Sequence, residues 1–166
     1  MQEAVLRRLT VDPVAPSFSP DATDPQVVGL QSWVWVDEAD FAPIQTPIEC
    51  IAAACAYAYA RPVRLGFDLG DDNGWFWCGE AGSGWPGVAY DTSRTYADQV
   101  GENHCYGVYT DDGDGRFTVR SRTVWMVGWT CVGCAEPSGD LGLLAVEASP
   151  IVLDVEDLQA VATPAD

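Results

Sequence analysis

Residues 116–130 form the longest regular stretch of the chain, and their side chains alternate between apolar and polar. Successive side chains of a β-strand point to opposite faces, so this alternation predicts a strand with one buried face. The predicted buried face carries Phe117, Val119, Trp125, Val127 and Trp129, and the other face carries Thr118, Arg120 and Arg122. At about 3.3 Å per residue the stretch spans roughly 50 Å, too long for one flat strand, so we expect a bend or bulge near residues 121–123.

Shorter stretches with β-branched, aromatic or alternating residues also favour strands. They are residues 33–36, 55–59, 63–69, 74–78, 141–147 and 151–155. Pro62 separates the second stretch from the third, and the Gly- and Asp-rich residues 70–74 predict a turn. About seven short strands joined by turns predict an all-β fold, most simply a β-sandwich.

The length of 166 residues predicts one domain with short tails. Residues 10–26 contain Pro13, Pro16, Pro20 and Pro25, which favour an extended N-terminal lead-in over a core element. Only residues 2–9 are suited to a short helical turn. We therefore divide the chain into an extended segment at 1–26, a β-sandwich at 27–161 and a tail at 162–166.

The cysteines are even in number and spread along the chain: Cys50, Cys55, Cys78, Cys105, Cys131 and Cys134. This pattern is typical of disulfides in an oxidising compartment or of a zinc site in a reducing one. Only Cys131 and Cys134 have the CxxC spacing that a zinc ribbon uses twice, so disulfides are favoured. The sequence does not select one pairing, and we expect the local one: Cys50–Cys55, Cys78–Cys105 and Cys131–Cys134. The second bridge would tether a long loop at 79–104.

The formal net charge is −17, from 25 acidic residues against eight arginines and no lysine. This balance argues against nucleic acid and anionic membrane surfaces as partners. No apolar run approaches the roughly 18 residues of a membrane helix, so we expect no membrane insertion. Residues 1–8 lack the apolar stretch of a signal peptide, so an exported chain would have lost its leader. The missing lysines fit either salt adaptation or a GC-rich genome.

Several short motifs follow one another along residues 32–161. They are Trp33-Val34-Trp35-Val36-Asp37, Pro62-Val63 before Phe67-x-x-Gly70-Asp71, Tyr90-Asp91-Thr92-Ser93-Arg94 after Cys78, Gln99 before Cys105-x-x-x-Tyr109, Gly115-x-Phe117-Thr118-Val119, Trp125-x-Val127-x-Trp129, and residues 155–161. In this order and spacing they resemble secreted actinobacterial proteins with a polycystic-kidney-disease-like (PKD-like) domain. The resemblance implies an immunoglobulin-like β-sandwich exported to the cell surface, a Cys78–Cys105 disulfide and no catalytic centre.

The chain departs from the PKD-like pattern at several positions. Gly70-Asp71-Asp72 replaces the usual Gly-Asp-Gly turn, and Gly107 stands where the histidine of His-x-Tyr is usual. Four of the six cysteines are additional to the pattern. These departures concern ligand binding rather than the sandwich.

Catalytic candidates are few. The one histidine, His104, precedes Cys105, and neighbouring side chains of a strand point apart, so a Cys–His dyad is disfavoured. A glycosidase needs two carboxylates, one of them in an apolar pocket, and no pair among the 25 acids has that setting. We expect no catalytic residue and no cofactor.

Asp111, Asp112 and Asp114 are weak calcium candidates, because calcium prefers several carboxylate oxygens. Their spacing fails the EF-hand register, and Asp–Gly runs are typical of a solvated hairpin turn. The turn is the favoured interpretation, and we expect no metal.

Trp75, Trp77 and Trp85 lie in or beside the long loop and are the binding candidates. An exposed pair of indoles can stack on sugar rings or anchor a protein partner, whereas the same residues could equally fill the core. Trp33, Trp35, Trp125 and Trp129 are expected in the core from their period-two placement. Tyr109 is expected to pin a corner of the sandwich through its hydroxyl.

These features favour a non-catalytic, exported interaction module of the cell surface or of an appendage, which presents the tethered 79–104 loop to an unknown surface protein or glycan. A carbohydrate-binding module that uses Trp75, Trp77 and Trp85 is the alternative. A hydrolase that uses loop carboxylates is a third, weaker hypothesis. An exposed edge strand would favour partner binding by strand addition.

Overall fold

The fold is all-β, as the sequence predicts. A computed structural model describes residues 2–79, 85–100, 102 and 105–158, and strands dominate these residues. The two helices, α1 (Gln2–Leu6) and α2 (Tyr96–Gln99), are short. The described residues contain no helix long and apolar enough to cross a membrane.

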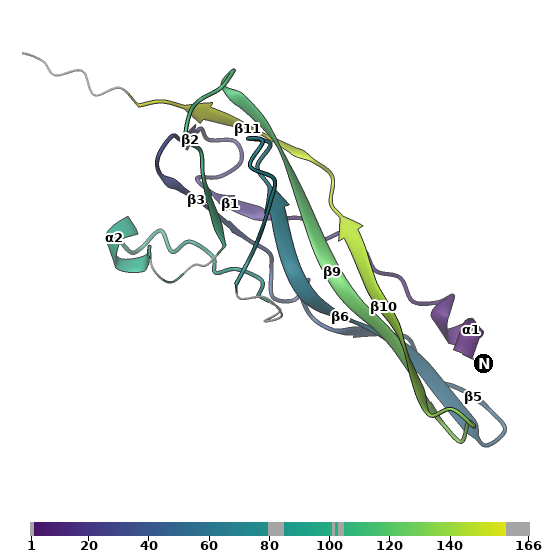
Figure 1. Cartoon of the computed structure of the whole chain (residues 1–166). Coiled ribbons are helices and arrows are strands. Elements are labelled where there is room, and N and C mark those ends of the chain that lie inside the picture. The colour runs from purple at the N-terminus through teal and green to yellow at the C-terminus, as the bar shows by residue number, and fades with distance from the viewer. Residues whose placement is uncertain (1, 80–84, 101, 103–104, 159–166) are drawn as a thin grey trace, which may run out of the picture.

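The strands form two sheets (Figure 1). The larger has the order β2 (Gln26–Val27), β11 (Ile151–Glu156), β9 (Arg116–Val132), β6 (Ala54–Asp68) and β4 (Ile44–Gln45); β10 (Ser138–Glu147) also pairs with β9, and β5 (Glu49–Ile51) and β7 (Trp75–Trp77) also pair with β6. The smaller has the order β1 (Ser17–Ser19), β3 (Gln31–Trp35) and β8 (Tyr106–Val108).

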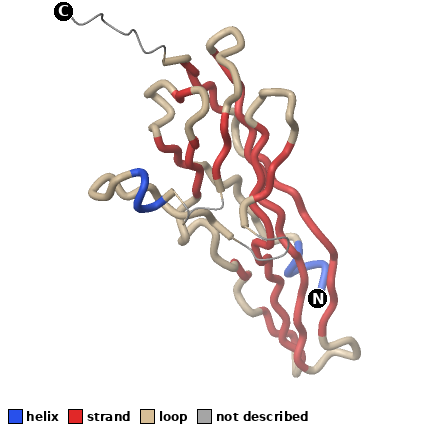
Figure 2. The backbone as a smooth tube through the Cα atoms, turned by 60° about the vertical axis from the view of Figure 1, so that its left-hand side comes forward, coloured by secondary structure: helices blue, strands red, loops and turns tan. Residues whose placement is uncertain are grey.

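The main core lies between the two sheets. Phe18 and Val34 of the smaller sheet belong to one buried cluster with Leu65, Phe67 and Trp125 of the larger sheet. Two sheets that share an apolar interior make a sandwich-like fold. The larger sheet is much longer than the smaller one and continues beyond it as a narrow ribbon (Figures 1 and 2).

Helix α1 covers the inner face of this ribbon. Its Val5 is fully buried against Ala56 and Ala58 of β6 and Trp129 of β9, in a second, smaller core. The alanines that alternate with Cys55, Tyr57 and Tyr59 are small enough for the helix to approach the sheet closely. The short helical turn predicted within residues 2–9 is therefore confirmed, and it buries apolar surface that would otherwise face water.

The prediction that residues 10–26 stay outside the core is wrong. β1 pairs with β3 and buries Phe18, and Gln26 of β2 pairs with β11 and is fully buried. Prolines are tolerated at edge strands, and β1 needs only three residues between Pro16 and Pro20 to place one phenylalanine in the core. The N-terminal segment is therefore part of the sandwich.

The long alternating stretch is confirmed as strand β9, whose odd-numbered residues face inward along its whole length. The expected irregularity does not lie at 121–123 in β9 but in its neighbour, where the β6–β9 register shifts between Pro62 and Arg64. Pro62 thus interrupts no strand, because a bulge is a place where a missing N–H is tolerated. The two expected strands on either side of Pro62 are one strand, β6.

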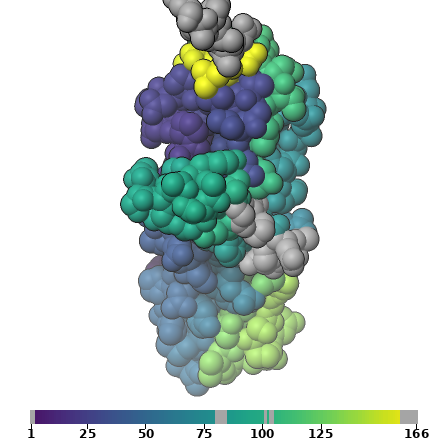
Figure 3. Space-filling view, turned by 90° about the vertical axis from the view of Figure 1, so that its left-hand side faces the viewer, coloured from purple at the N-terminus to yellow at the C-terminus, as the bar shows by residue number. Residues whose placement is uncertain are grey.

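The described part of the tethered 79–104 segment packs onto the smaller sheet (Figure 3). The Val36 N–H donates to the Pro86 carbonyl at 2.8 Å, and Trp33 meets Tyr90 edge to face at 5.3 Å. At Gly87, which has φ +84°, an added Cβ would lie 2.6 Å from the Val34 carbonyl oxygen. This contact positions the described loop residues against β3.

Tyr109 has the position that the sequence predicts for it. It is fully buried, and its hydroxyl donates to the Leu69 carbonyl at 3.5 Å. Burial, with a smaller effect from Asp71, raises the pKa of Tyr109 above its ordinary value, so the phenol stays protonated. It therefore keeps the hydrogen that it donates.

Candidate functional site

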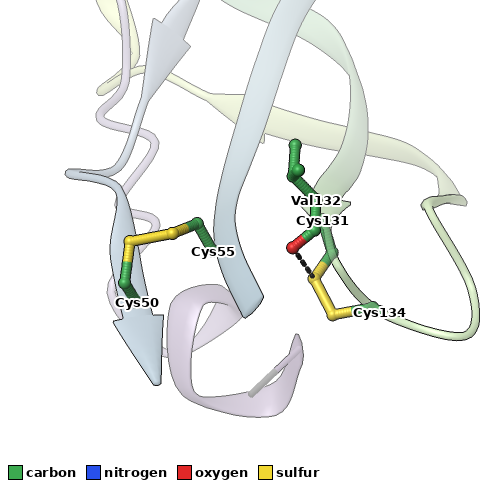
Figure 4. Close-up of a disulfide and its surroundings, with 5 residues drawn as sticks. All are labelled: Cys50, Cys55, Cys131, Val132 and Cys134. Atoms are coloured by element: carbon green, nitrogen blue, oxygen red, sulfur yellow. Dashed lines mark hydrogen bonds between the residues drawn. A yellow bond between two sulfur atoms is a disulfide. The ribbon is translucent and has the colours of Figure 1, made fainter. Parts of the chain in front are cut away.

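The six cysteines form the three expected disulfides, Cys50–Cys55, Cys78–Cys105 and Cys131–Cys134. The first and third lie close together near the end of the ribbon (Figure 4). No cysteine is left to ligate zinc. Three bridges in one chain suggest an oxidising, extracellular environment.

The outer face of the larger sheet gathers aromatic rings and cations. We call it the arginine–aromatic face; it comprises Tyr57, Tyr59, Arg61 and Arg64 of β6, Trp75 and Trp77 of β7, and Arg120 and Arg122 of β9. This group therefore contains four of the eight arginines of an acidic chain.

Trp75 and Trp77 point outward on this face, while Phe76 between them packs on the core against Phe67 at 5.6 Å. The two indoles stack with centroids 6.3 Å apart and planes 27° apart. The Arg122 guanidinium lies 4.1 Å from the Trp75 centroid, so that ring is already occupied by a cation. The shared face of the pair is as predicted, and its ligand-binding role stays a prediction.

Trp85 does not join this pair. It is partly buried and packs against the main core. Of the tryptophans expected in the core, Trp33, Trp125 and Trp129 are buried, and Trp35 is half-buried.

A shallow groove continues the arginine–aromatic face toward the end of the ribbon, with a volume of about 350 Å³. Tyr57, Tyr59 and Arg61 line it together with Pro43 and Gln45. Sequence reasoning missed this groove. The available signal was the alternation of Tyr57 and Tyr59 with alanines, which places both tyrosines opposite the buried alanine face.

Ion pairs occupy most of the arginines. Six of them pair with a carboxylate: Arg7 with Glu3, Arg8 with Glu49, Arg94 with Glu102, Arg116 with Asp154, Arg120 with Asp68, and Arg122 with Glu147. Arg61 and Arg64 have no carboxylate partner among the described residues. Each instead lies over an aromatic ring, Tyr59 or Trp77, at 5.6 Å from the centroid.

Asp68 is the buried acid of this region. Its carboxylate accepts the Gly70 N–H at 2.9 Å and pairs with Arg120. The Gly70 hydrogen bond chiefly, and Arg120 in addition, lower the pKa of Asp68 despite its burial. The charged carboxylate is therefore favoured in the folded state, and it links the 70–74 turn to β9.

Replacing Asp68 with Asn should lower the free energy of unfolding by about 1–2 kcal/mol at pH 7, because a charged hydrogen-bond acceptor is lost. The pKa of Asp68 is lower in the folded state than in the unfolded state. Its contribution to the free energy of unfolding is therefore complete above its ordinary pKa of about 4 and is lost as pH falls through the folded-state pKa. Urea unfolding of the wild type and the variant at pH 7 and pH 3 measures this contribution. The gap between Asp68→Asn and the wild type should shrink at pH 3, while the exposed Asp72→Asn should follow the wild type at both values.

The calcium candidates Asp111 and Asp114 cap their own turn. Their carboxylates accept the N–H groups of Gly113 and Arg116 at 3.1 and 3.2 Å. Asp112 is exposed in the same turn. Within the described ranges, no three His, Cys, Asp or Glu residues gather as a metal-binding group.

The carboxyls with a perturbed pKa are poor candidates for a general acid. Asp21, Asp68, Asp91 and Glu102 all have a pKa below the ordinary value, because each accepts hydrogen bonds. A glycosidase acid needs a raised pKa instead. His104 lies outside the described residues.

β10 is an exposed edge strand. It pairs with β9 on one side, and no described segment pairs with its other side. Its Leu141, Leu143 and Leu144 are 51%, 70% and 43% exposed. A bulge between Asp140 and Gly142 interrupts the register near its start.

Comparison with protein-family models, curated proteins and solved structures found no match.

Proposed function

We propose that the chain is a non-catalytic, exported interaction module of the PKD-like class, displayed on an actinobacterial cell surface or appendage. We further propose that it binds an extended segment of a partner protein as an additional strand beside β10. The three disulfides support export, because such bridges persist in oxidising compartments.

The observation that carries the proposal is the open edge of β10. A ten-residue edge strand offers a row of N–H and C=O groups that a further strand can pair with. Natural proteins usually protect such edges with lysine, proline or a covering loop. Besides the bulge near its start, β10 carries exposed leucines, which a partner strand would remove from water.

Charge determines the kind of partner. The chain carries a net charge of −17, and Asp140 and Glu147 lie in β10 itself. A second copy of the chain would bring like charges together, whereas a segment that alternates basic and apolar residues would match both the charge and the leucines. The partner is therefore a different protein with a basic extended segment.

Photo-cross-linking on intact producing cells tests this proposal. A benzoylphenylalanine at position 143 should give a discrete adduct whose cross-linked peptide is an extended segment rich in Lys or Arg. The same group at position 152 is the matched control, because Val152 is 46% exposed but lies in β11, which pairs with β9 at this position and with β2 at Val155 and Glu156.

The variant Leu143→Lys should abolish the adduct formed from a cross-linker at position 144, since a lysine protects an edge strand. Val152→Lys should leave that adduct unchanged. Equal adducts from positions 143 and 152, a cross-link between two copies of the chain, or no adduct would each contradict strand addition at β10.

A further inference from the structure

We propose that Arg61 and Arg64 form a binding site for an anionic glycan, a polysaccharide that carries carboxylates such as uronic acids. The site lies on the arginine–aromatic face and is separate from β10, so this inference does not depend on the strand-addition proposal. It starts from the two arginines that lack a carboxylate partner among the described residues.

The local backbone places both arginines on the same face. Residues 61 and 64 are three positions apart, so in a regular strand their side chains would point to opposite sides. The β6–β9 register shifts between Pro62 and Arg64, and the extra residue turns both side chains outward. Arg61 lies opposite Met126 and Arg64 opposite Val124, on the outer face of β9.

Aromatic rings support the two guanidinium groups. Arg61 lies over Tyr59, and Arg64 lies over Trp77. Each ring in turn lies over a glycine: a Cβ on Gly128 would come within 2.6 Å of the Tyr59 hydroxyl, and a Cβ on Gly66 within 2.7 Å of Trp77. The two glycines thus leave room for the rings that hold the cations.

Among the described residues, no acceptor takes a hydrogen bond from either guanidinium, so their donors can bind an anion. A guanidinium that stacks on a ring through its face keeps the N–H groups of its edge available, and these match a carboxylate in a bidentate geometry. In a chain with 25 acidic residues, carboxylates are abundant, and six arginines are paired with one. Arg61 and Arg64, which have no carboxylate partner among the described residues, are neighbours on one face, and this favours an anionic ligand there.

The groove beside Arg61 favours a sugar. Tyr57 and Tyr59 line it with ring centroids 6.4 Å apart, and the volume of about 350 Å³ is within the range of small-ligand sites. A pyranose ring can place its C–H groups on Tyr57 while a carboxylate reaches Arg61. The net negative charge of the chain does not prevent this, because charges more than about 8 Å away are screened at physiological salt.

Oligogalacturonate, its fully methyl-esterified form and poly-glutamate are the three probes, measured by calorimetry with the full chain. We expect oligogalacturonate to bind, the neutral ester to bind at least tenfold more weakly, and poly-glutamate to bind at least tenfold more weakly. Arg61→Gln/Arg64→Gln should weaken oligogalacturonate binding at least tenfold. Tyr57→Ala should weaken it severalfold without changing the binding of poly-glutamate.

Arg7→Gln/Arg8→Gln is the control, because it makes the same change in net charge at two exposed arginines beside α1, off this face. It should bind oligogalacturonate like the wild type, as should Leu143→Lys, and thermal unfolding should show that all variants fold. Equal losses in the two double variants, equal binding of poly-glutamate, or no binding of oligogalacturonate would each overturn the glycan site. None of these results bears on strand addition at β10.

Discussion

Replacing Cys78 and Cys105 together with alanine should lower the free energy of unfolding by about 4 kcal/mol, measured by urea unfolding without reductant. This bridge spans the largest sequence separation of the three, 27 residues. A cross-link restricts the unfolded chain more when the loop it closes is longer. Both sulfurs also lie in the main core, so the alanine variant loses buried apolar contacts as well.

Cys50→Ala/Cys55→Ala is the matched control. That bridge spans five residues and joins directly paired positions of β5 and β6, and Cys50 is exposed. Its removal should lower the free energy of unfolding by about 2 kcal/mol, roughly half the loss expected for the Cys78–Cys105 bridge. Equal losses in the two variants would show that loop closure and burial do not determine what each bridge contributes.

Local periodicity explains what the sequence predicts well. Odd-numbered residues of β9 face inward as their alternation indicates, because side-chain parity follows from the strand backbone alone. Leu65, Phe67 and Leu69 are buried as expected, but Gly66 and Asp68 between them are buried as well, because β7 covers that face. The turn at 70–74 and the short strand β7 follow from the same reasoning. The two strands after the Cys131–Cys134 bridge, β10 and β11, are also confirmed.

Long-range pairing explains what was missed. Nothing local shows that Phe18 completes a core formed by residues 34, 65 and 125, or that Gln26 pairs with β11. The prolines around β1 indicated a lead-in, but an edge strand of three residues is compatible with them. Pairing between distant segments depends on the whole fold, so the N-terminal segment was placed outside the sandwich.

The same limit applies to the arginine–aromatic face. Parity alone places Trp75 and Trp77 together, and the sequence analysis found them. Parity alone would also place Arg61 and Arg64 on opposite faces. A bulge of one residue reverses the parity and brings them to the same face, and Pro62 is its only sign in the sequence. Trp85 was grouped with the other two tryptophans by its nearness in sequence, whereas it packs against the core.

Replacing Gly70 with alanine should lower the free energy of unfolding by about 3 kcal/mol, through left-handed backbone strain and through collision of the new Cβ with β9. Comparison with the neighbouring Gly74 distinguishes the two causes. Gly70 has φ +76°, and a Cβ there would lie 2.7 Å from the Thr118 carbonyl oxygen of β9. Gly74, in the same turn, has φ +78° and nothing within 4 Å of a Cβ. Gly74→Ala therefore retains only the left-handed strain, about 1 kcal/mol.

Asparagine substitutions separate the two causes, because asparagine tolerates the left-handed region but still carries a Cβ. Gly74→Asn should unfold at nearly the urea concentration of the wild type, since its strain is relieved and its space is open. Gly70→Asn should remain destabilised by about 2 kcal/mol, because the collision with the backbone of β9 persists. If Gly70→Asn were as stable as Gly74→Asn, the turn would not pack against β9 at Thr118.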